Sequence, residues 1–261
     1  MRNSLKAVYK MMQATQNDVP IEKQFVNELK RSIEISDKKD SKPPSQTYKP
    51  SSMQCMRNMY YQRVGAPKGG ESTAVLIGIC ESGTDRHERV QAAVSRMRDN
   101  GFDCDYIDVS DYVTSRNLDY LEIVGKCGNE TKLYDASLAM SFMCDGIIRY
   151  KNKYYILEIK TESNHKWLDR KGVADEHKRQ AAAYSLAFGL DSVLFLYISR
   201  DMCDMKAFMY VVSQEEKDRV KSDIELCELY VNKGEVPPKD ENVPRKACTY
   251  CAYKSLCQAE V

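Results

Sequence analysis

Two apolar segments joined by a short polar turn constrain the fold of this chain most strongly. The first is FMCDGIIRY (142–150) and the second is YYILEIKT (154–161). Both are rich in aromatic and β-branched residues, and a polar RYKNK turn links them, so we expect a β-hairpin. Asp145 lies inside the first apolar segment. Burying a carboxylate there is unfavourable unless something pairs with it, so Asp145 needs a partner.

The second segment carries a candidate partner for Asp145. Because side chains alternate along a strand, Glu158 and Lys160 share one face, and Leu157 and Ile159 share the other. The hairpin could therefore bring Asp145 beside Glu158. Two carboxylates next to a lysine make an oxygen-ligand site for Mg²⁺ or Mn²⁺. The alternative is a solvated strand face with a cross-strand salt bridge.

An acid two residues before a lysine is a weak signal alone, because it recurs at Glu130/Lys132, Glu176/Lys178, Asp204/Lys206 and Glu215/Lys217. In the sequence none of these pairs shows a second acid in a neighbouring apolar strand. This distinction favours Glu158 and Lys160.

The remaining pattern predicts an α/β fold, with a mixed central β-sheet flanked by helices. We expect two short helices within 1–35, a proline-bearing linker over 36–52, and a helix from Ser52 that carries Cys55. A further helix over 84–100 is expected to be capped by Thr84, and another to end near Gly189. Strands are expected over 191–200 and 206–213. Ser213 and Glu216 predict a capping box that starts a helix over 213–233.

Composition restricts the location and the partners. No segment has the roughly 20 apolar residues that span a bilayer, and the first 20 residues lack a signal-peptide pattern. We expect a cytosolic protein without a membrane partner, so its ten cysteines are reduced thiols or metal ligands. Lys+Arg is 39 and Asp+Glu is 38, so any nucleic-acid surface is local.

The motifs around the hairpin resemble a known family. Asp145-Gly-Ile-Ile followed by Leu-Glu158-Ile-Lys160-Thr is similar to the core of the PD-(D/E)xK nuclease superfamily, which has a restriction-endonuclease-like fold. Gln180-x3-Tyr184 on the next helix, and Gly83-x3-His87 upstream, resemble its RecB-type branch. The family often has proline or tyrosine before its aspartate, whereas this chain has Cys144.

The resemblance implies a role for each of these positions. Asp145, Glu158, His87 and the Ile159 carbonyl would bind Mg²⁺ or Mn²⁺, and Lys160 would be the catalytic lysine. Gln180 and Tyr184 would position the scissile strand or support the site. Taken singly, His87, Gln180 and Tyr184 could also be ordinary helix residues.

The C-terminal segment ACTYCAYKSLC carries Cys248, Cys251 and Cys257, three potential thiolate ligands. Four cysteines suit Zn²⁺ or a [4Fe–4S] cluster equally on ligand type, and Cys227 and Cys203 are candidates for the fourth. One RecB-type subset, which includes AddB-type and CRISPR-associated nucleases, has one upstream cysteine and three downstream ones that bind a [4Fe–4S] cluster. The resemblance implies Cys55 as the fourth ligand; Zn²⁺ or four free thiols are the alternatives.

The same resemblance divides the chain into a helical N-terminal extension and linker (1–50) and a nuclease domain (51–261) closed by Cys55 and residues 248–257. Basic residues near the predicted site and in the tail are expected to contact DNA: Lys166, Arg170, Lys178, Arg179 and Lys254. Tyr250 and Tyr253 could stack on bases of single-stranded DNA, or the tail could be a solvated basic loop.

These patterns together predict a metal-dependent deoxyribonuclease. The resemblance favours an exonuclease that acts on DNA ends in recombination, repair or replication. The chain has no Gly-x4-Gly-Lys-Ser/Thr motif, so we expect either a free-standing enzyme or a subunit that relies on a helicase or recombination protein as its partner. The alternatives are an inactive DNA-binding or scaffold protein on the same fold, and a CRISPR-type end-trimming nuclease.

Overall fold

The computed structural model describes residues 19–39, 43–70, 72–128, 130–243 and 245–259. The chain divides into two compact units. One unit comprises Met1–Lys42 and Glu71–Ser82, and the other comprises Pro43–Gly70 and Gly83–Val261. The larger unit contains every residue of the predicted metal and cysteine sites.

The smaller unit contains helix α2 (Ile21–Lys39) and the first part of α4 (Ala74–Ser95). Helix α2 confirms the second of the two helices expected within 1–35, whereas the first falls largely within residues 1–18, outside the described residues. The predicted start of a helix at Thr84 is wrong, because α4 begins ten residues earlier. Its first turn is capped by Thr73, whose Oγ1 accepts the Leu76 N–H at 3.3 Å.

The larger unit is built on the predicted mixed sheet, with strand order β1-β5-β6-β7-β8. These strands are β1 (Cys104–Ile107), β5 (Gly146–Tyr150), β6 (Lys153–Glu162), β7 (Ser192–Ser199) and β8 (Met205–Val211). Only β6 and β7 pair in parallel, and the other neighbours are antiparallel. The parallel pair is connected through α6 (Asn164–Asp169) and α7 (Asp175–Phe188), because parallel strands need a crossover.

A second, antiparallel sheet consists of β2 (Leu121–Cys127), β3 (Glu130–Asp135) and β4 (Met140–Cys144). It follows a short helix, α5 (Val109–Ser115). Asp145 is the single residue between β4 of this small sheet and β5 of the central sheet. The apolar segment that was predicted as one strand therefore changes sheets at its only acid.

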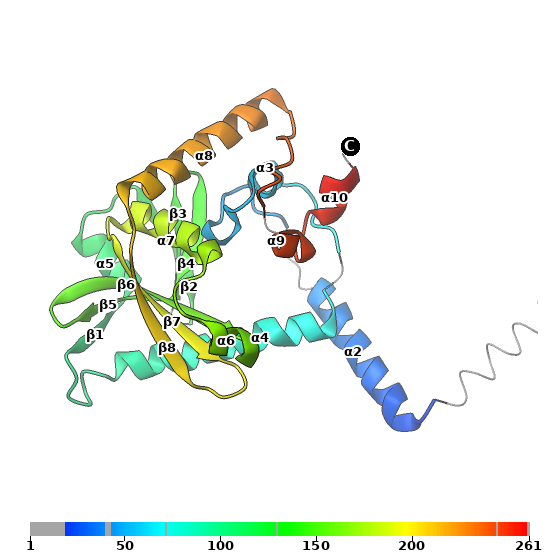
Figure 1. The fold of residues 1–261 in the computed structure, drawn as a ribbon, viewed down its shortest axis with the longest axis horizontal. Coiled ribbons are helices and arrows are strands. Elements are labelled where there is room, and N and C mark those ends of the chain that lie inside the picture. Colours follow the sequence, from blue (N-terminus) through cyan, green and yellow to red (C-terminus); the bar gives the residue numbers. More distant parts are fainter. Residues whose placement is uncertain (1–18, 40–42, 71, 129, 244, 260–261) are drawn as a thin grey trace, which may run out of the picture. The chain divides into compact units, whose positions relative to one another are not determined.

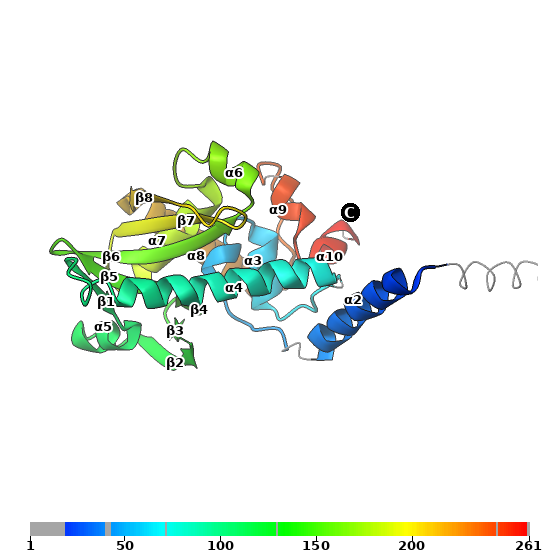
Figure 2. The ribbon, with the colours of Figure 1, turned by 90° about the horizontal axis from the view of Figure 1, so that it is seen from below.

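The two faces of the central sheet have different partners (Figures 1 and 2). On one face Leu157 and Ile159 form a buried cluster with Val90, from the part of α4 that follows Gly83. On the other face Ile156 packs in the main core with residues of α7, including Phe188. The alternation predicted for β6 is confirmed: Glu158 and Lys160 face α7.

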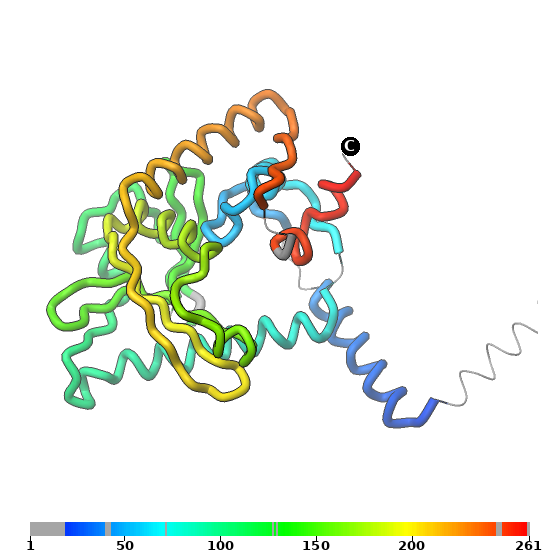
Figure 3. Tube along the Cα trace, viewed as in Figure 1, coloured from blue at the N-terminus to red at the C-terminus, as the bar shows by residue number. Residues whose placement is uncertain are grey.

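Helix α8 (Gln214–Lys233) begins with the predicted capping box, in which Ser213 and Glu216 bond each other's backbone N–H groups. Instead of one helix from Ser52, the chain forms a 3₁₀ turn (η1, Pro50–Ser52) and then α3 (Met56–Arg63), with Cys55 as N-cap. The tail forms α9 (Arg245–Thr249) and α10 (Lys254–Ala259) and returns beside α3 (Figure 3). Among the described helices, none combines the length and apolar character that a bilayer span requires.

We predict that Gly146→Ala destabilises the fold and disturbs the neighbouring Asp145. A Cβ at position 146 would lie 2.5 Å from Cε2 of the Tyr106 ring, so the ring or the strand has to move. Such overpacking costs about 1–3 kcal/mol of unfolding free energy, which urea denaturation measures. Gly172→Ala is the control, because no atom lies within 4 Å of the position that its Cβ would take. Equal midpoints for the two variants would contradict the prediction.

Candidate metal centre and cysteine cluster

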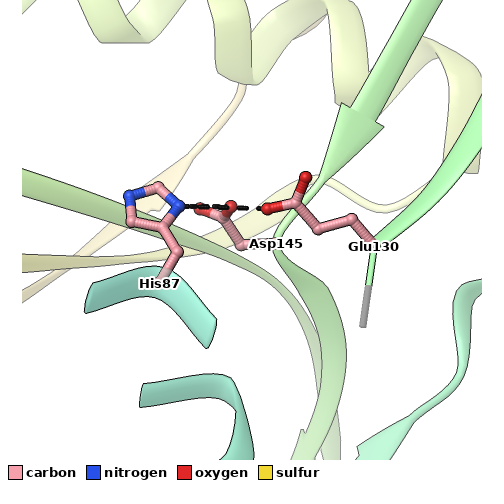
Figure 4. A group of neighbouring side chains, drawn as sticks. All are labelled: His87, Glu130 and Asp145. Atoms are coloured by element: carbon pink, nitrogen blue, oxygen red, sulfur yellow. Dashed lines mark hydrogen bonds and ion pairs between the residues drawn. The ribbon is translucent and has the colours of Figure 1, made fainter. Parts of the chain in front are cut away.

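Three side chains from different elements converge next to the sheet junction (Figure 4). His87 comes from α4, Glu130 begins β3, and Asp145 lies between β4 and β5. His87 Nδ1 lies 2.9 Å from Asp145 Oδ1 and 4.0 Å from Glu130 Oε1. One ligand atom from each residue lies within 4.8 Å of those of the other two, which is close enough to hold one metal ion.

Glu130 is the member of this group that sequence reasoning missed. Its pair with Lys132 was set aside because no second acid was visible in a neighbouring strand, and this interpretation is wrong. Strands β3 and β4 pair with Thr131 opposite Cys144, so Glu130 comes level with Asp145. Because β3 and β4 are consecutive in the sequence, their pairing could have been expected. Glu130 lies in the polar segment GNETK, however, whose composition does not indicate a strand.

The backbone fixes the position of Asp145. The Ile159 N–H on β6 donates to Asp145 Oδ2. Gln91 Nε2 and the Tyr106 hydroxyl donate to the Asp145 carbonyl at 2.8 and 2.9 Å. The Asp145 carboxylate is thus held between β6 and His87, and the group of Ile159 that contacts it is the N–H, whereas the predicted metal ligand was the Ile159 carbonyl.

Glu158 belongs to a second network of hydrogen bonds, on the face of the central sheet toward α7. Lys160 Nζ donates to Glu158 Oε1 at 2.6 Å and to Gln180 Oε1 at 2.9 Å. Gln180 Nε2 in turn donates to Glu158 Oε1 at 2.8 Å and to the Tyr184 hydroxyl at 2.9 Å. The Tyr184 hydroxyl donates to the Met143 carbonyl at 2.8 Å. Gln180 and Tyr184 therefore lie on one face of α7, where Gln180 bonds the Glu158–Lys160 pair of β6 and Tyr184 bonds Gln180 and the backbone of β4.

The site holds more negative charge than its own cations neutralise. Burial raises the pKa of Glu158 to about 7; the Asp145 charge adds to this effect and Lys160 opposes it. Burial and then Asp145 raise the pKa of Glu130 to about 7 as well. Burial disfavours the charged form of His87, but its hydrogen bond to Asp145 and the surrounding carboxylates outweigh burial and raise its pKa.

The residues present fit a hard divalent cation. Glu158 Oε2 is buried and has no hydrogen-bond partner among the described residues, and a buried carboxylate oxygen without one is unfavourable. Carboxylate oxygens with one imidazole suit Mn²⁺ or Mg²⁺. A bound cation would favour the charged forms of both glutamates, whose pKa values are raised by burial and then by Asp145. His87, Glu130 and Asp145 would hold the ion, with Glu158 and the Ile159 carbonyl as the further predicted ligands.

The four predicted cysteine ligands come from opposite ends of the larger unit and lie in one region, where Cys55, Cys248 and Cys251 line a common cavity. Among the described residues, no three of their sulfur atoms lie within 4.8 Å of one another. Burial raises the pKa of Cys55, and the nearby thiols of Cys251 and Cys257 add to the effect. Burial likewise raises the pKa of Cys251, with contributions from Cys248 and Cys257. Thiolates are ligands of both Zn²⁺ and iron–sulfur clusters, so the donor type suits either, but the sulfur atoms do not converge as the ligand atoms of His87, Glu130 and Asp145 do.

Helix α3 supports this cluster from its first turn. Arg57 Nη1 lies 3.5 Å from Cys257 Sγ and donates to the Cys257 carbonyl at 3.1 Å. Asn58 Nδ2 lies 3.8 Å from Cys251 Sγ. Cys227, a candidate for the fourth ligand, is instead fully buried in the main core. Cys203 lies beside Arg86.

The basic residues predicted to contact DNA fall into two groups. Arg170 forms a two-pronged ion pair with Glu162 and covers the Tyr197 ring, and Arg179 donates to Asp223 and to the Met53 carbonyl. These two arginines are thus occupied within the fold. Lys178 pairs with Asp175 on the surface, and Lys166 and Lys254 are exposed.

Comparison with known proteins identifies no family. No family model matches the chain, and no curated protein matches its sequence. Among solved structures, the one described as "Crystal structure of SSO0001" is similar, with a TM-score of 0.46 and 16% sequence identity. The match covers 93% of this chain and 100% of that chain, and it carries no functional inference.

We predict that Cys55→Ala loses bound metal as completely as Cys251→Ala, whereas Cys227→Ala retains it. Removing any ligand leaves an open coordination position, while Cys227 lies in the core. Iron, sulfide and zinc analysis of purified protein, together with the visible absorbance spectrum, measures this. Full metal content in Cys55→Ala would contradict the assignment, and a colourless protein with one zinc would identify the ion as Zn²⁺.

We also predict that Glu130→Gln weakens Mn²⁺ binding at least tenfold, a loss of about 1.4 kcal/mol, because it removes an anionic ligand. Isothermal titration of the full chain with MnCl₂ measures the affinity. Glu122→Gln is the control, since Glu122 is an exposed acid on the neighbouring strand β2. Unchanged affinity in Glu130→Gln would show that Glu130 is not a ligand.

Proposed function

We propose that this protein is a metal-dependent nuclease that hydrolyses phosphodiester bonds in DNA. The observation that carries the proposal is the pair of connected networks around Asp145 and Glu158. They place buried, insufficiently neutralised carboxylates beside a lysine that is 21% exposed in its side chain. Charged groups whose pKa values are shifted this way, in a cluster that includes a partly exposed lysine, are typical of catalytic sites.

The chain's own residues supply orientation and charge. Mg²⁺ or Mn²⁺ would provide Lewis-acid stabilisation of a phosphoryl oxygen and would activate water. The Lys160 ammonium lies beside Glu158, where it can stabilise negative charge that develops on a phosphodiester. Gln180 holds Lys160 and Glu158 at fixed separation, and Tyr184 fixes Gln180. We therefore assign Gln180 and Tyr184 as positioning residues.

The wider role follows from the resemblance noted in the sequence. We propose an intracellular exonuclease that acts on DNA ends in recombination, repair or replication, with a helicase or recombination protein as a possible partner. A [4Fe–4S] cluster, or Zn²⁺, in the four-cysteine site would stabilise the fold rather than take part in hydrolysis. Its support is that Cys55 is the N-cap of α3 whereas Cys248, Cys251 and Cys257 lie in the tail, so a shared ion or cluster would join the two.

We predict that the full chain degrades linear DNA only with Mg²⁺ or Mn²⁺ and that Lys160→Ala lowers the rate by roughly 10²–10³, the cost of one charge-stabilising donor. End-labelled linear DNA and closed circular DNA are compared on denaturing gels. An exonuclease degrades only the linear substrate.

Lys153→Ala is the matched control, because Lys153 is an exposed lysine on the same strand. Its rate should equal that of the wild type. If wild type, Lys153→Ala and Lys160→Ala all leave single- and double-stranded DNA intact, the protein is not a nuclease. DNA binding without cleavage would then favour a scaffold protein on this fold.

A further inference from the structure

A cavity of about 430 Å³ lies beside the cysteine cluster. Cys55, Cys248 and Cys251 form part of its lining. The rest includes polar and basic side chains that the metal centre and the cysteine cluster do not use. Pockets of roughly 300–1,000 Å³ take groups the size of a small organic ligand, so this one has room for a nucleotide unit but not for a duplex.

Lysine side chains give this cavity a positive charge. Lys49 and Lys68 line it, and Lys132 is near enough to influence Lys49. Burial lowers the pKa of Lys49, and the charges of Lys68 and Lys132 lower it further. In the described part of the chain none of these three lysines forms an ion pair. Lys68 and Lys132 are exposed and Lys49 is half-buried, so an anion from solvent can reach them, and phosphate is the anion that nucleic acids present.

These lysines continue from the metal centre along one face of the small sheet. Burial alternates along β3, so Glu130 and Lys132 lie on the face away from the core, while Thr131 is buried. Tyr48 forms a bridge with Met140 of β4 and is fully buried, so Lys49, the next residue, lies on the outer side. Glu130, Lys132 and Lys49 therefore share one surface, which leads from the metal centre to the cavity.

Two further groups in the cavity suit a nucleotide. Gln62 is 8% exposed, and its Oε1 has no hydrogen-bond partner among the described residues. Gln62 Nε2 donates to Asn58 at 2.9 Å, so the amide is oriented with its oxygen free to accept from a base amino group. Tyr250 also lines the cavity and is 79% exposed, which leaves its ring available for stacking. Tyr253, the other predicted stacking residue, is buried against Tyr61.

We propose that this cavity is a second DNA-binding subsite, which takes a nucleotide of a single strand whose reacting phosphodiester lies at the metal centre. The proposal rests on the proposed nuclease function. Lys49, Lys68 and Lys132 contact successive phosphates, Tyr250 stacks on a base, and Gln62 accepts a hydrogen bond from a base. The cysteine cluster then orders one wall of a substrate channel as well as joining the ends of the unit.

The same lysines could instead neutralise a negatively charged metal–thiolate cluster. The two roles differ in what the lysines control. A DNA contact changes DNA affinity and its dependence on salt while metal content is retained. A cluster-neutralising lysine changes the metal content of the purified protein, and DNA affinity falls only along with it.

The experiment measures binding of a fluorescently labelled single strand of about 15 nucleotides, without added divalent ions, by anisotropy between 50 and 200 mM salt. We expect the double variant Lys49→Ala/Lys68→Ala to bind at least tenfold more weakly at low salt. The slope of log affinity against log salt should fall by about 0.7 for each lysine removed, the value for single strands. Lys221→Ala, an exposed lysine of α8, is the control and should match the wild type.

Metal content and cleavage are measured on the same preparations. If the double variant Lys49→Ala/Lys68→Ala has the same DNA affinity and salt slope as Lys221→Ala, the subsite is overturned. The subsite is also overturned if the double variant loses DNA affinity together with its metal. Wild-type protein that shows the lysine-dependent slope but cleaves nothing supports the subsite and overturns the nuclease. If the wild-type protein cleaves DNA but the lysine substitutions leave its DNA binding unchanged, the subsite is overturned and the proposed nuclease function is not.

Discussion

The burial of Glu158 on the central strand β6 is the constraint on which the site depends. Its side chain is 5% exposed, in a position where a charged group is unfavourable unless it is paired. Lys160 and Gln180 supply that pairing, and both must reach it from fixed directions. Helix α7 can place Gln180 there because Ala181, Ala182 and Ala183 are small and almost fully buried, which lets the helix lie close to the sheet.

The close approach of α7 to the sheet positions the side chains of the candidate site. Gln180 bonds both partners of the Glu158–Lys160 pair, and Tyr184 connects Gln180 to the backbone of β4 through the Met143 carbonyl. Strand β4 leads directly into Asp145, so the two carboxylate networks share a rigid support. Buried networks of this kind are favourable when every member is satisfied. Glu158 Oε2, like Gln91 Oε1 beside Asp145, has no hydrogen-bond partner among the described residues. The unsatisfied Glu158 oxygen marks where a cation would be stabilising.

The sequence predicted those parts of the site in which a local pattern coincides with a structural role. Alternation on β6 placed Glu158 and Lys160 correctly, and the spacing of Gln180 and Tyr184 placed both on one helix face. Glu130 was not predicted as a metal ligand, because its position beside Asp145 depends on the pairing of β3 with β4, which no local sequence pattern encodes. Helix α4 was predicted to start too late, because Thr84 was an acceptable cap and the residues before it, AVLIGICESG, include few strong helix formers.

The four cysteines show that proximity between residues far apart in the sequence is established by the structure rather than by local patterns. Nothing between positions 55 and 248 indicates by spacing that these residues meet, and only the family resemblance suggested it. In the structure the tail is fixed to the region after α3 by a backbone hydrogen bond of 2.7 Å from Gly69 to Ala252, and by Arg57 at Cys257. Tyr253 of the tail is also buried in the main core, so contacts within the protein already hold the tail, and an ion bound by the thiols would add to them. Metal binding would therefore contribute to folding of this region directly. Because the same cysteines line the cavity with Lys49 and Lys68, that contribution also sets the shape of the surface that faces a substrate.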